Sequence, residues 1–162
     1  MIRPIAPADA EPVLALAHAT GLFTPDELPE LRAMLDGALD GSMPDHLWFM
    51  DDDGPAEPGR ERVAGLAYVA PEAFADGVWN LYLLAVDPAR QGGGRGAALV
   101  RHVEDTVRAR GARLLLIETS GLESFEATRG FYRRIGYAEE ARIRDYYEPG
   151  DDKVVFTKAL GA

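Results

Sequence analysis

A glycine-rich segment interrupts the middle of the chain, in "AVDPARQGGGRGAALV", residues 85–100. Gly92, Gly93, Gly94 and Gly96 fill four of the five positions from 92 to 96. Glycine loses more backbone entropy on ordering than any other residue, and a tight strand-to-helix connection needs only one or two. The excess therefore indicates a backbone that is approached closely by something other than the chain's own side chains.

The spacing Gln91-x-x-Gly94-x-Gly96 runs directly into an alanine-rich helical pattern. Backbone amides of such a loop point inward together and reinforce the positive end of the helix dipole. Together they form a cradle for a pyrophosphate group, which side chains would block. The segment is thus predicted to bind phosphate through its main chain.

Two other interpretations compete with this one. The first is a plain connection with surplus glycine. The second is a dinucleotide fold, because "GGGRGA", residues 92–97, matches G-x-G-x-x-A, and Glu118 follows about 20 residues later, where an acidic ribose ligand is expected. However, residues 87–91 separate the glycines from the preceding strand, and too little chain follows Glu118 for further strand–helix units. No Gly-Lys-Ser/Thr follows the glycines, which argues against a phosphate-loop NTPase.

Two sequence motifs, which follow each other in the same order as in that family, resemble motifs of the GNAT superfamily of N-acetyltransferases. "LAVDPARQGGGRGAALV", residues 84–100, is similar to the acetyl-coenzyme A loop of that family, and "FEATRGFYRRIGY", residues 125–137, to its later helix. The resemblance covers essentially the whole chain and implies a single N-acetyltransferase domain over residues 1–162, with acetyl-CoA as co-substrate. It implies backbone pairing of the pantetheine arm with Leu84, Ala85 and Val86, and diphosphate binding by Gln91, Gly92, Gly93, Gly94, Arg95, Gly96 and Ala97.

The same resemblance suggests the catalytic groups. Tyr132, four residues before Gly136, is expected to act as the general acid that protonates the departing thiolate. Glu118 is the favoured general base, since an apolar strand would desolvate its carboxylate and make it more basic; water relayed by backbone carbonyls is the alternative. Each residue also has a purely structural interpretation: Tyr132 as a packed aromatic side chain, and Glu118 as a surface carboxylate at the end of a strand. The segment "GLESFEATR" lacks the Asn that many relatives carry early in this helix.

The acceptor side is predicted from two further regions. The loop through Phe23 joins two helices that cover the acceptor in relatives. "ARIRDYYEPGDDKVVF", residues 141–156, resembles the C-terminal hairpin of ribosomal-protein alanine N-acetyltransferases, so Tyr146 and Tyr147 are expected to line an acceptor groove; an ordinary solvated hairpin is the alternative. The sequence leaves open whether the amine belongs to a small molecule or a peptide. A non-catalytic acyl-CoA-binding or regulatory module is the alternative function.

Composition narrows further the classes of partner, cofactor and mechanism that fit this chain. The 162 residues carry a net charge of −10, which argues against a nucleic-acid partner. The absence of cysteine excludes an acetyl-cysteine intermediate and favours direct attack in a ternary complex. His18, His46 and His102 show no paired spacing, so no metal is expected. No apolar run is long enough to span a membrane, which predicts a cytoplasmic protein. A homodimer remains open.

Hydrophobic periodicity and turn signals predict an α/β fold, a mixed sheet of six to seven strands with about four helices on its faces. The expected order is β-α-α-β-β-β-α-β-α-β-β. The strands are predicted at residues 1–7, 46–51, 63–70, 78–86, 113–120, 137–147 and 153–160, with a hairpin loop at 51–62. The helices are predicted at residues 10–20, 25–40, 95–110 and 124–135.

Overall fold

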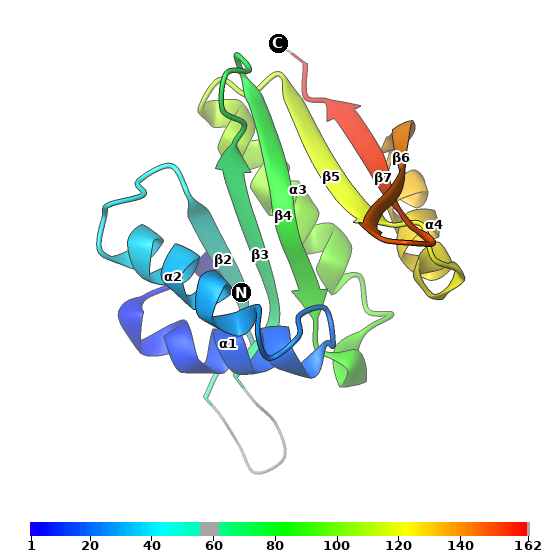
Figure 1. Ribbon diagram of the computed structural model, residues 1–162. Helices are drawn as coiled ribbons and strands as arrows, with labels where there is room; N and C mark the ends of the chain where they lie inside the picture. The colour runs from blue at the N-terminus through cyan, green and yellow to red at the C-terminus, as the bar shows by residue number, and fades with distance from the viewer. Residues whose placement is uncertain (56–61, 162) are drawn as a thin grey trace. The chain divides into compact units, whose positions relative to one another are not determined.

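The computed structural model describes residues 1–55 and 62–161, and its elements follow the expected order (Figure 1). Residues 56–61 of the predicted hairpin loop at 51–62 lie outside these residues. The α/β class, the seven strands and the four helices are confirmed. The elements are β1 (Ile2–Pro4), α1 (Ala10–Ala19), α2 (Leu28–Leu39), β2 (Leu47–Asp52), β3 (Val63–Pro71), β4 (Val78–Val86), α3 (Arg95–Ala109), β5 (Leu114–Ser120), α4 (Glu126–Arg134), β6 (Ala138–Glu148) and β7 (Asp151–Ala159).

The strands form one sheet in the order β1-β2-β3-β4-β5-β7-β6. The pair β4–β5 is parallel, because helix α3 carries the chain back to the same end of the sheet before β5 begins. The pairs β1–β2, β2–β3, β5–β7 and β6–β7 are antiparallel. Every residue of β3 from Val63 to Ala70 is buried, as expected for a continuous apolar run in a strand covered on both faces.

The chain forms two compact units, each built from separate stretches of sequence. The first contains residues 1–70 and 83–105, and the second contains residues 71–82 and 106–162. In the first unit, α1 and α2 pack against β2, β3 and the end of β4 through a core that includes Val13, Leu35, Met50, Leu66 and Leu83. In the second unit, the buried residues include Leu115, Ile117, Val154 and Phe156.

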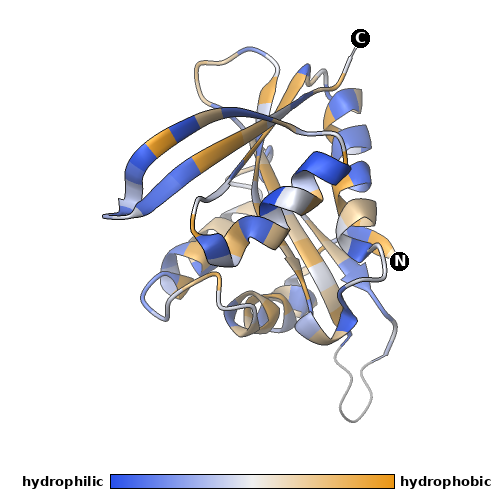
Figure 2. Cartoon of the chain, turned by 90° about the vertical axis from the view of Figure 1, so that its right-hand side faces the viewer, coloured by the Kyte–Doolittle hydropathy of each residue, from blue (hydrophilic) through white to orange (hydrophobic). Residues whose placement is uncertain are grey.

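Strand β6 is an irregular edge strand, exposed along its whole length. Its register against β7 shifts between Ile143 and Glu148, where Asp145 adopts a φ of 54°. The Asp145 carboxylate accepts a hydrogen bond from Gly150 N (2.8 Å), and the backbone N–H of Asp145 donates one to Asp152 Oδ1 (3.0 Å). Polar and apolar residues alternate along the β6–β7 ribbon in Figure 2. The extra residues on β6 include both tyrosines of the predicted acceptor groove.

Arg129 holds the start of α4 against the end of β5. Its buried guanidinium donates hydrogen bonds to Ser120 O (2.6 Å) and Leu122 O (2.9 Å) and forms an ion pair with Glu126 (2.8 Å). These bonds satisfy carbonyl groups that the strand-to-helix connection would otherwise leave without partners. Arg129 therefore helps to fix the position of α4 and of the tyrosine it carries.

We expect Arg129→Met to lower the free energy of unfolding by about 3 kcal/mol, because it leaves two carbonyl groups without their donor. Chemical denaturation measures this change. Arg134→Met is the matched control, since Arg134 lies exposed on the same helix and should cost less than about 0.5 kcal/mol. Equal losses in the two variants would contradict the role given to Arg129.

Candidate active site

The glycine loop begins with a short turn after β4, in the first unit. Asp87 accepts a hydrogen bond from Ala89 N (2.9 Å), and the Gln91 side-chain amide donates to Val86 O (3.2 Å). Gln91, predicted to bind the cofactor, thus also fixes the turn. The Val86 carbonyl, predicted to pair with pantetheine, already accepts this bond.

The glycines leave open space above the loop backbone. Gly92 and Gly94 have φ values of 81° and 78°, which favour glycine, whereas Gly93 does not have a positive φ. A Cβ atom added at any of the three would meet no atom within 4 Å. Packing within the chain therefore does not account for Gly93, and this is the situation expected where a ligand approaches the main chain.

The loop leads directly into α3, a helix of 15 residues. Its first hydrogen bond runs from Ala98 N to Gly94 O (3.0 Å). The amides of Arg95, Gly96 and Ala97 consequently have no acceptor within the helix. These amides and the helix dipole make the loop suited to an anion such as a diphosphate.

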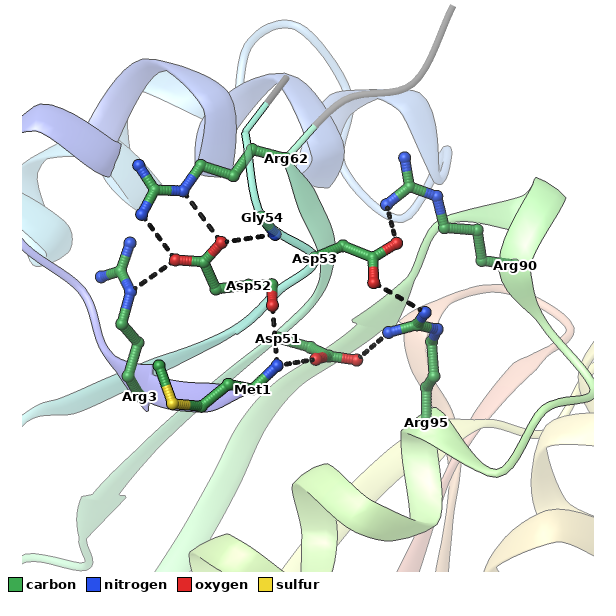
Figure 3. Close-up of polar contacts among 9 residues, drawn as sticks. All are labelled: Met1, Arg3, Asp51, Asp52, Asp53, Gly54, Arg62, Arg90 and Arg95. Carbon is green, nitrogen blue, oxygen red and sulfur yellow. Dashed lines mark hydrogen bonds and ion pairs between the residues drawn. The ribbon is translucent and has the colours of Figure 1, made fainter. Parts of the chain in front are cut away.

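The side chains of the two arginines in this segment are held by carboxylates at the end of β2 (Figure 3). Arg95 bonds to Asp51 (2.5 Å) and Asp53 (3.1 Å), and Arg90 bonds to Asp53 (3.3 Å). The hydrogen bond to Asp51 raises the pKa of Arg95 against the opposing effect of burial, with a further contribution from Asp53. Arg95 therefore anchors the loop through its guanidinium, and its amide lies in the first turn of α3.

Asp52, between these two acids, takes a different set of partners. Successive residues of an extended chain point to opposite sides. Asp52 accordingly bonds to Arg3 (2.8 Å) and Arg62 (2.6 Å), and it accepts a hydrogen bond from Gly54 N (3.0 Å). The hydrogen bond from Arg62 outweighs desolvation and, with Arg3 and Gly54, holds the pKa of Asp52 far below its usual range. The sequence predicted a strand that ends at Asp51 and a hairpin loop after it, and gave no signal for this network of ion pairs.

In the second unit, β4 and β5 pair from Val78–Leu114 to Leu81–Ile117. These pairs end one position before Tyr82 and Glu118, which come next in the register. Both strands continue beyond this point, β4 to Val86 and β5 to Ser120.

Glu118 forms an ion pair with Lys153 of β7, with Oε2 and Nζ 2.9 Å apart. We expected apolar surroundings for this carboxylate. That expectation is wrong, because the buried ammonium of Lys153 is its neighbour. Burial alone would lower the pKa of the Lys153 ammonium, but the hydrogen bond and charge of Glu118, helped by Tyr146, raise it above its ordinary value. No sequence signal pointed to Lys153, because only the register of β5 and β7 brings it beside Glu118.

The two predicted acceptor tyrosines belong to the same group of side chains. The Lys153 ammonium lies 4.1 Å from the centre of the Tyr146 ring, and the Tyr146 and Tyr147 rings meet edge to face at 5.1 Å. Both tyrosines are about half exposed, and burial raises the pKa of Tyr147. The second unit thus brings together Glu118, Lys153 and both tyrosines.

Tyr132 is buried among aromatic rings of the second unit. Its ring centre lies 5.3 Å from that of Phe131, 6.2 Å from that of Tyr137 and 5.7 Å from that of Phe156. Within the described part of the chain, its hydroxyl makes no hydrogen bond, and desolvation raises its pKa strongly.

Tyr132 and Glu118 lie toward opposite faces of the sheet. Phe156 is directly opposite Ile117 in the β5–β7 register, so these two side chains share a face. Glu118, the next residue along β5, points to the other face. Tyr132 packs on the Phe156 face. The two predicted catalytic groups are therefore not direct neighbours.

The remaining predicted acceptor residue, Phe23, is partly buried against the core formed by α1 and α2 in the first unit. Packing against this core accounts for the part of the Phe23 side chain that is buried. Across residues 1–55 and 62–161, no group of three or more metal-ligating side chains occurs. Nor does any helix in this part of the chain combine the length and apolar character that a membrane span requires.

Comparison with known proteins identifies the family. A family model described as "Acetyltransferase (GNAT) domain" matches residues 44–139. A crystal structure of a putative acetyltransferase of the GNAT family from Desulfovibrio desulfuricans is 34% identical, with 99% of each chain covered and a TM-score of 0.88. No curated protein matches the chain. The chain belongs to the acetyltransferase (GNAT) family, and its class is that of an N-acetyltransferase.

More distant structures share the fold. A ribosomal-protein alanine N-acetyltransferase from Escherichia coli is 19% identical, covering 100% of this chain and 94% of its own, with a TM-score of 0.77. An aminoglycoside 6′-N-acetyltransferase complexed with coenzyme A is 16% identical, covering 100% and 98%, also with a TM-score of 0.77. At these identities the likeness concerns the fold alone.

The buried Tyr132 hydroxyl predicts a specific pH dependence of stability. The folded chain holds this proton more tightly than the unfolded chain, whose phenol has the ordinary pKa of 10.0. Raising the pH above this value therefore favours unfolding, by at most about 1.4 kcal/mol per pH unit for one proton. We expect Tyr132→Phe to unfold with a shallower alkaline dependence, measured by denaturation between about pH 10 and 12. Identical slopes for wild type and variant would contradict this assignment.

Proposed function

We propose that this protein transfers the acetyl group of acetyl-CoA to a primary amine by direct attack in a ternary complex. The amine nitrogen attacks the thioester carbonyl, the carbon–sulfur bond breaks, the thiolate gains a proton and the amine loses one. The observation that carries the proposal is the glycine loop, whose open backbone precedes the first amides of α3. Family membership supports the reaction class.

The loop is proposed to bind the diphosphate of coenzyme A through the amides of residues 92–97. Gly93, which has neither a positive φ nor a close neighbour, supports this assignment. Arg95 and Arg90 support it indirectly, because their bonds to Asp51 and Asp53 hold the segment in place. A structural neighbour complexed with coenzyme A is consistent with the same ligand here.

Tyr132 is proposed as the general acid. Its raised pKa keeps the phenol protonated at neutral pH, so the proton is available to the departing thiolate. Low polarity around the hydroxyl also disfavours a naked thiolate, which promotes the transfer. Its hydroxyl has no hydrogen-bond partner among the described residues that would compete with the thiolate.

The amine proton is proposed to leave through Glu118 or through relayed water. Glu118 is already engaged in an ion pair with Lys153, which gives weight to the relay. Tyr146 and Tyr147, exposed beside this ion pair, are proposed to contact the acceptor, whether it is a small molecule or a peptide amine.

Tyr132→Phe should lower kcat by about 10²-fold or more while leaving acetyl-CoA affinity nearly unchanged, because only the proton donor is lost. Release of the CoA thiol in the presence of an amine panel measures turnover, and calorimetry measures affinity. Unchanged turnover would remove Tyr132 from the mechanism. Acetyl-CoA binding by the wild type without thiol release for any amine would instead favour a non-catalytic binding module.

Gly93→Ala should weaken coenzyme A binding at least about fivefold, because a methyl group would occupy the space assigned to the diphosphate. The free energy of unfolding should change by less than about 0.5 kcal/mol, since the added Cβ meets no atom of the chain. Calorimetry and denaturation test the two parts. Gly130→Ala, on α4 in the second unit, is the control and should bind coenzyme A normally. Normal binding by Gly93→Ala would contradict the loop assignment.

A further inference from the structure

A second polar group lies at the turn between β3 and β4, in the second unit. The Glu72 carboxylate accepts hydrogen bonds from Asn80 Nδ2 (2.7 Å) and from the Tyr82 hydroxyl (3.2 Å). Both bonds end on the same oxygen, Oε1. Among the described residues, Oε2 receives no hydrogen bond and neither oxygen has a cation as partner. Glu72 is only partly buried, so Oε2 can be reached by a small ligand.

Glu72 differs in this respect from three carboxylates of its unit that have cations as partners. Glu118 is paired with Lys153, Glu126 with Arg129 and Arg133, and Asp152 with Arg142. The donors that hold Glu72 are neutral. Its negative charge is therefore not compensated within the described chain, although its position is fixed by two hydrogen bonds.

Asn80 is an unusual residue to find in this position. Its side chain is only 1% exposed, and its Oδ1 is one of two buried side-chain atoms without a hydrogen-bond partner in the described chain. Turning the amide over would place Oδ1 against the Glu72 carboxylate, so the orientation is set by chemistry. An unpartnered buried carbonyl destabilises the fold, and a leucine of similar size would avoid that cost.

The retained asparagine is explained by the bond that its Nδ2 donates. A buried amide is rigid, so it holds the Glu72 carboxylate in one orientation, in which Oε2 receives no hydrogen bond from the described residues. A buried polar group that costs stability and at the same time holds a charged group in one orientation is typical of functional sites. Tyr82, whose ring is half exposed, lies two residues after Asn80 on β4. Its hydroxyl donates a hydrogen bond to the same Glu72 oxygen.

The group also lies beside the point where the pairing of β4 and β5 ends. The last pair is Leu81–Ile117, and Tyr82 is the next residue on β4, as Glu118 is on β5. Glu72, Asn80 and Tyr82 therefore lie beside the last paired residues of β4 and β5. Of the two nearby glutamates, only Glu72 has a charge that a cationic ligand could neutralise without displacing Lys153.

We propose that Glu72 binds the acceptor amine as its ammonium ion through Oε2, with Asn80 and Tyr82 as positioning residues for the carboxylate. The acceptor is then a primary amine that is positively charged in solution, and the carbon chain next to the nitrogen lies along the Tyr82 ring. This assignment rests on the proposed function, since it names the residue that receives the acceptor of that reaction.

The test is an NMR titration of the full chain without acetyl-CoA, using n-butylammonium chloride as the probe and the Asn80 side-chain amide signal as the readout. Loss of the signal in Asn80→Leu assigns it. We expect a saturable shift with n-butylammonium and none with n-butanol, which has the same carbon chain but no charge. Glu72→Gln should raise the Kd at least tenfold. Glu123→Gln removes an exposed carboxylate from the same unit and should leave the Kd unchanged.

A wild type that shows no saturable shift, or a Glu72→Gln variant that binds as tightly as the wild type, would overturn the assignment. Thiol release with acetyl-CoA is measured separately on the same proteins. Normal amine-dependent thiol release and KM in Glu72→Gln would reject Glu72 while leaving the acetyltransferase proposal intact. Absence of thiol release from the wild type would reject the proposed function, whereas the titration still judges the amine site.

Asn80→Leu separates positioning from simple packing. If Asn80 is retained to orient Glu72, its replacement should leave the melting temperature unchanged or raise it, and should weaken n-butylammonium binding at least fivefold by calorimetry. A lower melting temperature with unchanged amine affinity would show that Asn80 serves the fold alone and would overturn its part in the proposal.

Discussion

The first amides of α3 can bind an anion only if the loop before them is held still without using those amides. Glycines at positive φ make the loop open, and openness alone would also make it mobile. The side chains supply the missing rigidity: Arg95 spans Asp51 and Asp53, and Arg90 shares Asp53. Each bond is made by a guanidinium and a carboxylate, so the main-chain donors stay available. The loop is thus anchored from the side while its ligand-facing backbone remains open.

Charge pairing also distinguishes the carboxylates around the end of the β4–β5 pairing. Glu118 is compensated by Lys153, and this pair is stabilised further by the Tyr146 ring. Glu72 is held by neutral donors and has no cation as a partner among the described residues. Two glutamates near the same strand ends are therefore suited to different tasks, because a carboxylate that already has a cation gains little from a second one.

The separation of the proposed acid, Tyr132, from the proposed base, Glu118, across the sheet has a simple chemical consequence. Proton donation to a thiolate and proton removal from an amine occur at different atoms of the reacting complex, so the two groups need not touch. Tyr132 lies among aromatic rings on the Phe156 face, where its phenol stays neutral. The charged groups lie toward the other face. A break in strand pairing is the kind of place where a substrate could be reached from both.

Periodicity and turn residues are local properties of the chain, and they were enough to predict the order of elements and the class of the fold. Boundaries were less certain: α2 begins at Leu28, after a turn in which Glu27 accepts a hydrogen bond from Thr24 N (2.8 Å), rather than at residue 25. Tertiary structure decided the partners of each charge. Lys153 meets Glu118 through strand register, Asp51 meets Arg95 across 44 positions, and Asn80 meets Glu72 across a turn. Such pairings depend on which distant residues folding brings within about 3 Å, and residue type alone carries no record of that distance.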